Sequence, residues 1–361
     1  MARKRRARWI VLGVVGVLVL GLVFVGVGYV DQNTNYTERD AEQLARAGVT
    51  TKITTVGGHE THYAEGPDNG PPLLLIHGQG SQWDDYAKVL PTLINSHHVF
   101  VIDVYGHGRS ARLPAQEYTA VRIGTLIAEF MEQRLGGSAL VSGHSSGALL
   151  AAWLAANRPD LVSGVLLEDP PFYSSIMPRA AQTTGGAIFP IARDFLAQSE
   201  QRDFQRYFVE HGDYFSFFGP VKNQIKAYAL GYLDDHPGQP LEIFFLPPMV
   251  NVFFRGLVNY DPAFGAAWFD NHWYDGYDTD QVLKSIKVPT VFLHTNYFQQ
   301  TTGSYYQNGI LMAAMDGEEK DRALGLLRNE ELVEVPSGHL VHFERPDAYL
   351  DAFTRLTTRV P

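Results

Sequence analysis

The most constraining feature of the sequence is the segment Gly143–Gly147, which reads GHSSG. It follows the apolar run 139–141 and precedes 148–154, a run of small and apolar residues typical of a helix. Glycines at both ends allow a sharp turn and a close approach of strand and helix, so the serine between them is expected to be exposed and strained. The pattern predicts a strand, a tight turn and a helix, with Ser145 as a candidate nucleophile.

Three other apolar runs have the length and composition of buried strands: 72–76, 98–102 and 332–335. The first leads into the glycine-rich loop 77–80 (HGQG), and the last leads to His339. Because the carboxyl ends of parallel strands meet at one edge of a sheet, where ligands bind, we expect this loop, Ser145 and His339 to lie close together.

These motifs, in this order, resemble the α/β-hydrolase fold superfamily, and the resemblance covers residues 49–170 and 285–361. It implies an α/β fold with a mostly parallel central sheet flanked by helices. Over a hundred residues separate the predicted strands 164–167 and 289–294. Members of this superfamily carry a cap at that place, so we expect a helical cap inserted after the sixth strand.

The resemblance also implies a serine hydrolase site. By position, Ser145 matches the family's nucleophile and His339 its general base. The backbone N–H groups of Gln79 and Ser146 match its oxyanion hole. A serine hydroxyl needs a neighbouring imidazole to take its proton, and the tetrahedral oxyanion needs hydrogen-bond donors that are fixed in advance.

The acid that would orient the histidine departs from the commonest pattern of the family. Members usually carry an Asp after the strand that follows the cap, but here the run 295–300 contains no carboxylate. A minority place the acid at the end of the preceding strand, where this chain has Glu168 and Asp169 before two prolines. We predict Asp169, held in extended geometry by the prolines, with Glu168 as the backup acid. Alternatively, Asp169 only caps the strand, and Asn296 or a residue of the cap orients His339.

Other histidines are interpreted as structural, since His77 and His107 belong to turn motifs and His144 lies on the opposite side of the turn from the nucleophile. No H-E-x-x-H motif is present, and His339 and His342 lack Cys or carboxylate partners at metal-ligand spacing. No G-x-G-x-x-G or Walker A motif follows a strand. We therefore expect neither a metal nor a cofactor.

The N-terminus predicts a membrane anchor. Residues 1–8 contain five basic side chains, and Trp9–Val30 is an uncharged run of 22 residues. A helix of that length spans about 33 Å, close to the thickness of a bilayer core. The basic cluster is expected to stay in the cytoplasm, which places the rest of the chain outside. A cleaved signal peptide is the alternative, although its apolar region is normally shorter, roughly 7–15 residues.

The part of the chain beyond residue 30 is acidic, with 24 basic against 39 acidic residues, so a nucleic-acid partner is not expected. There is no cysteine, which excludes disulfides. More than half of the aromatic residues lie in 172–280, where most would form the core of the cap and a minority would line an apolar pocket. The predicted parts are a basic tail and transmembrane anchor (1–30), a stalk (31–48), the first part of the hydrolase core (49–170), the cap (171–284) and the second part of the core (285–361).

The sequence therefore predicts a single-pass, membrane-anchored, extracytoplasmic serine hydrolase of the carboxylesterase or lipase type, which acts on a small apolar ester and contacts the bilayer through residues 9–30. A serine at position 145 argues against the haloalkane dehalogenases and epoxide hydrolases of the family, which carry an Asp there. An acyltransferase or a cofactor-free haloperoxidase would use the same triad. A non-catalytic, membrane-tethered binding protein on the same fold is the alternative from another class.

Overall fold

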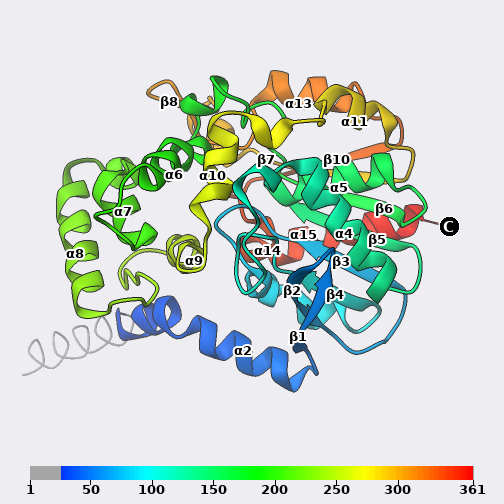
Figure 1. Cartoon of the computed structure of the whole chain (residues 1–361), viewed down its shortest axis with the longest axis horizontal. Coiled ribbons are helices and arrows are strands. Elements are labelled where there is room, and N and C mark those ends of the chain that lie inside the picture. Colours follow the sequence, from blue (N-terminus) through cyan, green and yellow to red (C-terminus); the bar gives the residue numbers. More distant parts are fainter. Residues whose placement is uncertain (1–25, 361) are drawn as a thin grey trace, which may run out of the picture.

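An eight-stranded sheet forms the centre of the structure, a computed structural model that describes residues 26–360 (Figure 1). Its strands lie in the order β1-β2-β4-β3-β5-β6-β7-β10, and a short antiparallel pair, β8 and β9, lies apart. The strands are β1 (Thr50–Val56), β2 (His59–Glu65), β3 (Pro72–Ile76), β4 (His98–Ile102), β5 (Ala139–His144), β6 (Val162–Glu168), β7 (Thr290–Thr295), β8 (Tyr306–Gln307), β9 (Ile310–Leu311) and β10 (Glu330–Val335). Strands β1, β2 and β4 pair antiparallel and the other pairs of the large sheet are parallel, so the predicted mostly parallel α/β sheet is confirmed.

Both faces of the sheet are buried in its central strands, β3 to β7. In β3, Leu74 and Ile76 pack in one hydrophobic cluster, whereas Leu73 and Leu75 pack in a second cluster on the other face. The first face is covered by α4 (Ala120–Arg134) and α5 (Ser146–Asn157), and the second by η1 (Trp83–Lys88), α3 (Leu90–Leu93) and α15 (Pro346–Arg359). Because no strand face is left to water there, the central strands read as continuous apolar runs, and β3 and β4 begin and end where the sequence predicts.

The chain between β6 and β7 adopts a series of helices. They are η3 (Arg179–Gln182), η4 (Gly185–Ala187), α6 (Ile188–Leu196), α7 (Phe204–His211), η5 (Tyr214–Val221), α8 (Lys222–Asp235), α9 (Pro248–Leu257), α10 (Pro262–Phe269), η6 (His272–Tyr274) and α11 (Thr279–Ser285). In Figure 1, α6 to α9 lie to one side of the sheet. The remaining helices are η2 (Ala115–Glu117), α12 (Tyr297–Thr302), α13 (Gly317–Leu324) and α14 (Val341–Glu344).

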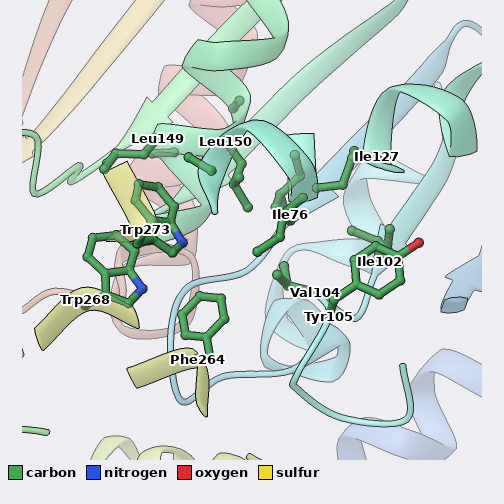
Figure 2. Packing of buried hydrophobic residues seen from close by; sticks show 14 of the residues in the cluster. Ile76, Ile102, Val104, Tyr105, Ile127, Leu149, Leu150, Phe264, Trp268 and Trp273 are labelled. Carbon is green, nitrogen blue, oxygen red and sulfur yellow. The ribbon is translucent and has the colours of Figure 1, made fainter. Parts of the chain in front are cut away.

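Aromatic residues of this inserted segment share the core of the sheet. Figure 2 shows Phe264, Trp268 and Trp273 packed near Leu149 of α5 and Ile76 of β3, all within one hydrophobic cluster. The rings of Trp268 and Trp273 are stacked, with centroids 3.9 Å apart. The inserted helices are therefore fixed to the sheet by buried apolar surface.

The segment predicted as a stalk packs against the body of the protein. Residues 26–34 are helical and are followed by helix α2 (Tyr36–Arg46). Asn33 is buried and its side-chain amide donates to the carbonyls of Phe244, at 3.0 Å, and Leu246, at 2.7 Å. Leu44 is also buried, two helical turns after Tyr36 on the same face. Most of the predicted stalk, residues 31–48, is thus helical, and two of its buried side chains contact the body of the protein.

The predicted membrane span falls largely outside the described residues. Positions 9–25 of that span are not among them, and positions 26–30 are helical. Within residues 26–360, no helix combines the length and the apolar composition that a bilayer crossing requires.

Candidate active site

The segment Gly143–Gly147 forms the predicted turn between β5 and α5. Ser145 has φ +54° and ψ −123°, a strained conformation for a residue with a side chain, and its N–H donates to the Glu168 carbonyl at 2.9 Å. A Cβ atom on Gly147 would lie only 2.3 Å from the Ile76 carbonyl oxygen. Glycine is therefore required where α5 meets β3, and the turn presents Ser145 at the carboxyl edge of the sheet.

The glycine-rich loop after β3 packs directly on this turn. A Cβ atom on Gly78 would lie 2.8 Å from the Cβ of Ser145. Within residues 26–360, neither the Gln79 N–H nor the Ser146 N–H donates to a protein acceptor. Both groups stay available as donors, as an oxyanion hole requires, and this role stays a prediction.

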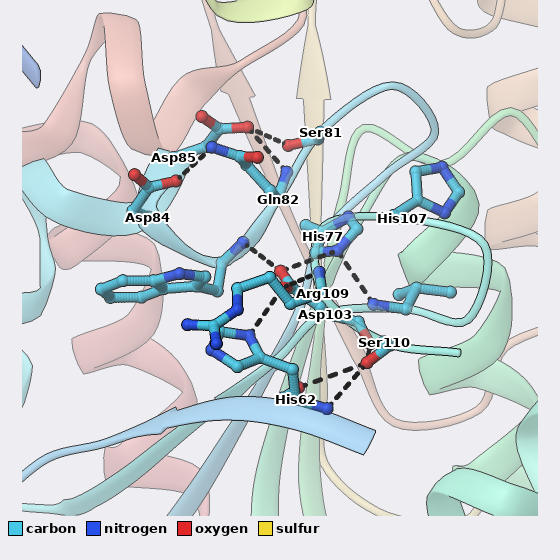
Figure 3. A network of polar contacts seen from close by, with 12 residues as sticks. His62, His77, Ser81, Gln82, Asp84, Asp85, Asp103, His107, Arg109 and Ser110 are labelled. Carbon is cyan, nitrogen blue, oxygen red and sulfur yellow. Dashed lines mark hydrogen bonds and ion pairs between the residues drawn. The ribbon is translucent and has the colours of Figure 1, made fainter. Parts of the chain in front are cut away.

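A buried polar network fixes the same loop from the side of β4 (Figure 3). The Nε2 atom of His77 accepts from the Val104 N–H at 3.0 Å, so its Nδ1 carries the proton and donates to the Gly78 carbonyl at 2.8 Å. Burial lowers the pKa of His77, which keeps this ring neutral. The ring also lies near Asp103, which accepts from the Trp83 N–H, the Arg109 N–H and the ring of His62. His77 is thus a structural residue, as the sequence indicates.

Helix α9 and Tyr260, which follows it, hold the loop from its other side. A Cβ atom on Gly256 would lie 2.0 Å from the Gly80 carbonyl oxygen, so α9 contacts the loop backbone to backbone. The side-chain amide of Gln79 donates to the Tyr260 hydroxyl. Arg255 forms ion pairs with Asp84 and Asp85 just after the loop.

Asp169 and His339 lie within hydrogen-bond distance of each other. The Nδ1 atom of His339 is 2.6 Å from Oδ2 of Asp169, whose side chain is fully buried after β6. Burial alone would raise the pKa of Asp169, but the imidazoles of His294 and His339 outweigh it and hold that pKa below its ordinary value. The ionised carboxylate can accept a hydrogen bond from the Nδ1–H group, which leaves Nε2 of His339 free to take a proton.

The backbone of Asp169 differs from the extended geometry expected before a proline. Its φ is +44°, in the left-handed region, which costs on the order of 1 kcal/mol for a residue with a side chain. Its N–H donates to the Leu293 carbonyl at 2.8 Å. Its carboxylate accepts from the Thr295 N–H at 3.1 Å and from the Thr295 hydroxyl at 2.8 Å. Hydrogen bonds to β7 therefore override the local preference.

His339 is also tied to the turn that carries the candidate nucleophile. The Nε2 atom of buried His144 is 3.0 Å from the His339 carbonyl oxygen, and because a carbonyl only accepts, this nitrogen carries a proton. The centroids of the His144 and His339 rings lie 4.6 Å apart. The structure thus brings the His339 segment beside Ser145, and His144 has a structural role, as the sequence indicates.

Glu168 and Asn296, two of the alternatives to Asp169, have other hydrogen-bond surroundings. Glu168 is fully buried and binds His342, accepting from its N–H and its Nδ1 at 2.9 Å each, so it does not face His339. Asn296 is buried, its N–H donates to the Val335 carbonyl, and its side-chain oxygen has no partner within residues 26–360. Asp169 is the carboxylate that the structure places on His339.

Sequence reasoning missed the partners of this carboxylate. Thr295 donates to it twice, and the Nδ1 atom of His294 lies 3.6 Å from its Oδ1. Both residues end β7, where the family usually carries the acid itself. The sequence signal that could have identified His294 and Thr295 is their position: they are two polar residues at the end of a strand after which the expected carboxylate is absent.

We predict that Asp169→Asn lowers turnover of a short-chain aryl ester by roughly 10⁴-fold, because an amide neither stabilises the imidazolium nor favours the required tautomer. Glu168→Gln is the matched control, since its side-chain carbonyl can still accept the His342 N–H, and it should lose far less activity. Steady-state kinetics of both variants measures this ranking. The reverse order would assign the orienting role to Glu168.

The pH dependence of activity follows from the surroundings of His339. Burial alone would lower its pKa, but the hydrogen bond and charge of Asp169 outweigh burial, so the pKa lies above the ordinary value of 6.5. Since the base must be neutral, kcat/KM for an uncharged ester should fall as the pH drops, with a midpoint above 6.5. In Asp169→Asn the midpoint should move to lower pH. A midpoint that stays in place would contradict the coupling.

Comparison with known proteins agrees with this architecture. The sequence profile of the family described as alpha/beta hydrolase fold matches residues 71–346. Lipase 3 of Moraxella sp. (strain TA144) and Lipase 1 of Psychrobacter immobilis are each 29% identical over 133 residues, which cover 36% of this chain and 42% of each relative. The matched region thus spans less than half the length of these lipases.

Two solved structures show the same fold. A membrane phospholipase A, described as a bacterial virulence factor, superimposes with a TM-score of 0.61 at 21% identity. The match covers 96% of this chain and 98% of the phospholipase chain. A hydrolase from Pseudomonas aeruginosa PA01 gives a TM-score of 0.59 at 20% identity, with 85% of this chain and 98% of its own covered. On its sequence profile, sheet order and strand-turn-helix motif, the chain belongs to the α/β-hydrolase fold family.

Proposed function

We propose that the protein is a serine hydrolase that cleaves carboxylic esters through Ser145, His339 and Asp169. The observation that carries this proposal is the 2.6 Å contact between His339 Nδ1 and the buried carboxylate of Asp169, beside the strained turn at Ser145. A histidine whose Nδ1 is held by an ionised acid has its Nε2 available as a general base.

The proposed reaction has two steps. His339 takes the hydroxyl proton of Ser145 as the oxygen attacks the ester carbonyl, and the N–H groups of Gln79 and Ser146 stabilise the oxyanion. The alcohol leaves with the proton from His339, and an acyl-enzyme remains on Ser145. Water, deprotonated by His339, then releases the acid and restores the serine. Asp169 stabilises the imidazolium in both steps.

The substrate class is supported by the inserted helices and by the relatives. The segment between β6 and β7 is rich in aromatic residues, and its helices α9 and α10 contact the loop that carries Gln79. Two of the matching bacterial relatives are named lipases. An ester with an apolar acyl or alcohol group fits these observations.

We also propose that residues 9–30 anchor the protein in a membrane, with the catalytic part outside the cytoplasm. The basic tail and the uncharged run support this topology. The described end of that run lies beside exposed apolar groups, since the Tyr29 hydroxyl donates to the Phe245 carbonyl at 3.3 Å, and Val27, Phe244 and Phe245 are exposed.

The function is tested by Ser145→Ala, which we expect to abolish both hydrolysis of short-chain aryl esters and covalent labelling by a fluorophosphonate. Removal of the nucleophile of a triad costs about as much as removal of the whole triad, roughly 10⁶-fold in kcat. Circular dichroism should show an unchanged fold.

The matched control is Ser138→Ala, at an exposed serine just before β5, which should react and label as the parent does. If Ser145→Ala is labelled as strongly as Ser138→Ala, Ser145 is not the nucleophile. A parent protein that neither labels nor turns over any ester would favour a binding protein on the same fold.

The topology is tested by fractionation. The full chain should stay in the membrane pellet after a carbonate wash, because an apolar helix of about 20 residues is held by the bilayer rather than by charge. Protease added to spheroplasts should reach the C-terminal part. Recovery of a soluble product that begins near Asp31 would show a cleaved signal peptide instead.

A further inference from the structure

The end of strand β7 binds Asp169 at three points. Its carboxylate oxygens accept from the N–H and the hydroxyl of Thr295, at 3.1 and 2.8 Å, and its own N–H donates to the Leu293 carbonyl at 2.8 Å. Both residues are buried, with exposed fractions of 3% for Thr295 and 0% for Asp169. Water therefore does not compete for these hydrogen bonds, and each one constrains the carboxylate.

The hydroxyl of Thr295 acts on the same oxygen that faces the histidine. Oδ2 of Asp169 accepts from Thr295 Oγ1 and lies 2.6 Å from His339 Nδ1, whereas Oδ1 accepts from the Thr295 N–H. Because Thr295 supplies one donor to each oxygen, the carboxylate cannot rotate about its Cβ–Cγ bond without breaking a hydrogen bond. Its direction toward His339 is thereby fixed.

Thr295 also lies between the two strands that carry the pair. Strand β7 pairs with β6, which leads to Asp169, and with β10, which leads to His339. In the β10 pairing Thr295 stands opposite Val335. Asp169 itself has a left-handed backbone, φ +44°, which a residue with a side chain adopts only when its surroundings enforce it.

We propose that Thr295 is a positioning residue: its hydroxyl and N–H hold the Asp169 carboxylate in the orientation that binds His339. This inference rests on the proposed function, since it assigns a role to Thr295 only through the acid of that triad. It also accounts for the missing carboxylate after β7, because this strand end holds the acid instead of supplying it.

The test is Thr295→Val, which keeps the shape of the side chain and removes the hydroxyl, with Thr295→Ser as the variant that restores it. Thr290→Val is the matched control, because Thr290 is a buried threonine at the start of the same strand. Among the described residues, 26–360, its hydroxyl binds only the Val288 carbonyl. Each variant is made in the parent and in the Asp169→Asn background. The measurements are kcat and KM for a short-chain aryl ester, the rate of fluorophosphonate labelling, and the melting temperature.

We expect Thr295→Val to lower kcat and the labelling rate about tenfold with little change in KM, because it removes a hydrogen bond to a charged group that acts only through the triad. Thr295→Ser should return to within about twofold of the parent, and Thr290→Val should keep the parent kcat. In the Asp169→Asn background, Thr295→Val should change the labelling rate less than about twofold, since residues that act as a unit are not additive.

Parental kcat in Thr295→Val, together with a nearly inactive Asp169→Asn, would overturn the positioning role alone. An equal loss of activity from Thr295→Val in both backgrounds would also overturn it, because such a loss marks a merely structural effect. A failure of Thr295→Ser to recover would also overturn the role of the hydroxyl. Parental activity in Asp169→Asn would instead overturn the proposed triad, and the role of Thr295 with it.

Discussion

The contact between Asp169 and His339 joins residues 170 positions apart, and the candidate site depends on it. Three adjacent parallel strands, β6, β7 and β10, make it possible, because their carboxyl ends meet at one edge of the sheet. A shift of β7 by one residue would turn Thr295 to the opposite face and leave the acid without two of its donors. The register of these strands, fixed by apolar side chains on both faces, thus controls the geometry of a polar site.

Much of this arrangement could be predicted from local sequence. The central strands are apolar on both faces, so each appears in the sequence as a continuous apolar run rather than as alternating apolar and polar residues. Strands β3 and β4 have the predicted bounds. The glycines around Ser145 indicated the turn because only a missing side chain allows such contact with β3. Asp169 was favoured over other acids because the chain lacks a carboxylate after β7. The geometry agrees with that choice, because the Asp169 carboxylate lies 2.6 Å from His339 Nδ1.

The parts that local sequence did not predict depend on contacts between distant segments. The left-handed backbone of Asp169 arises from hydrogen bonds to β7, which outweigh the preference imposed by the following proline. The pairing of Glu168 with His342 depends on how the segment after β10 returns to β6. The segment 31–48 is polar overall, and local sequence does not show which of its few side chains become buried, because that depends on the surface against which they pack.

The helices inserted between β6 and β7 contact the loop that carries the predicted oxyanion donor Gln79. Gly256 of α9 contacts the backbone at Gly80, and Tyr260 binds the side chain of Gln79. From the other side, His77 holds the carbonyl of Gly78. Because the loop is fixed between the sheet and α9, a change in α9 that alters the fit of a substrate would also move Gln79, the proposed oxyanion donor of this loop. Specificity and rate are therefore expected to change together in this protein, and substitutions that alter specificity alone should lie in inserted helices that do not touch the loop.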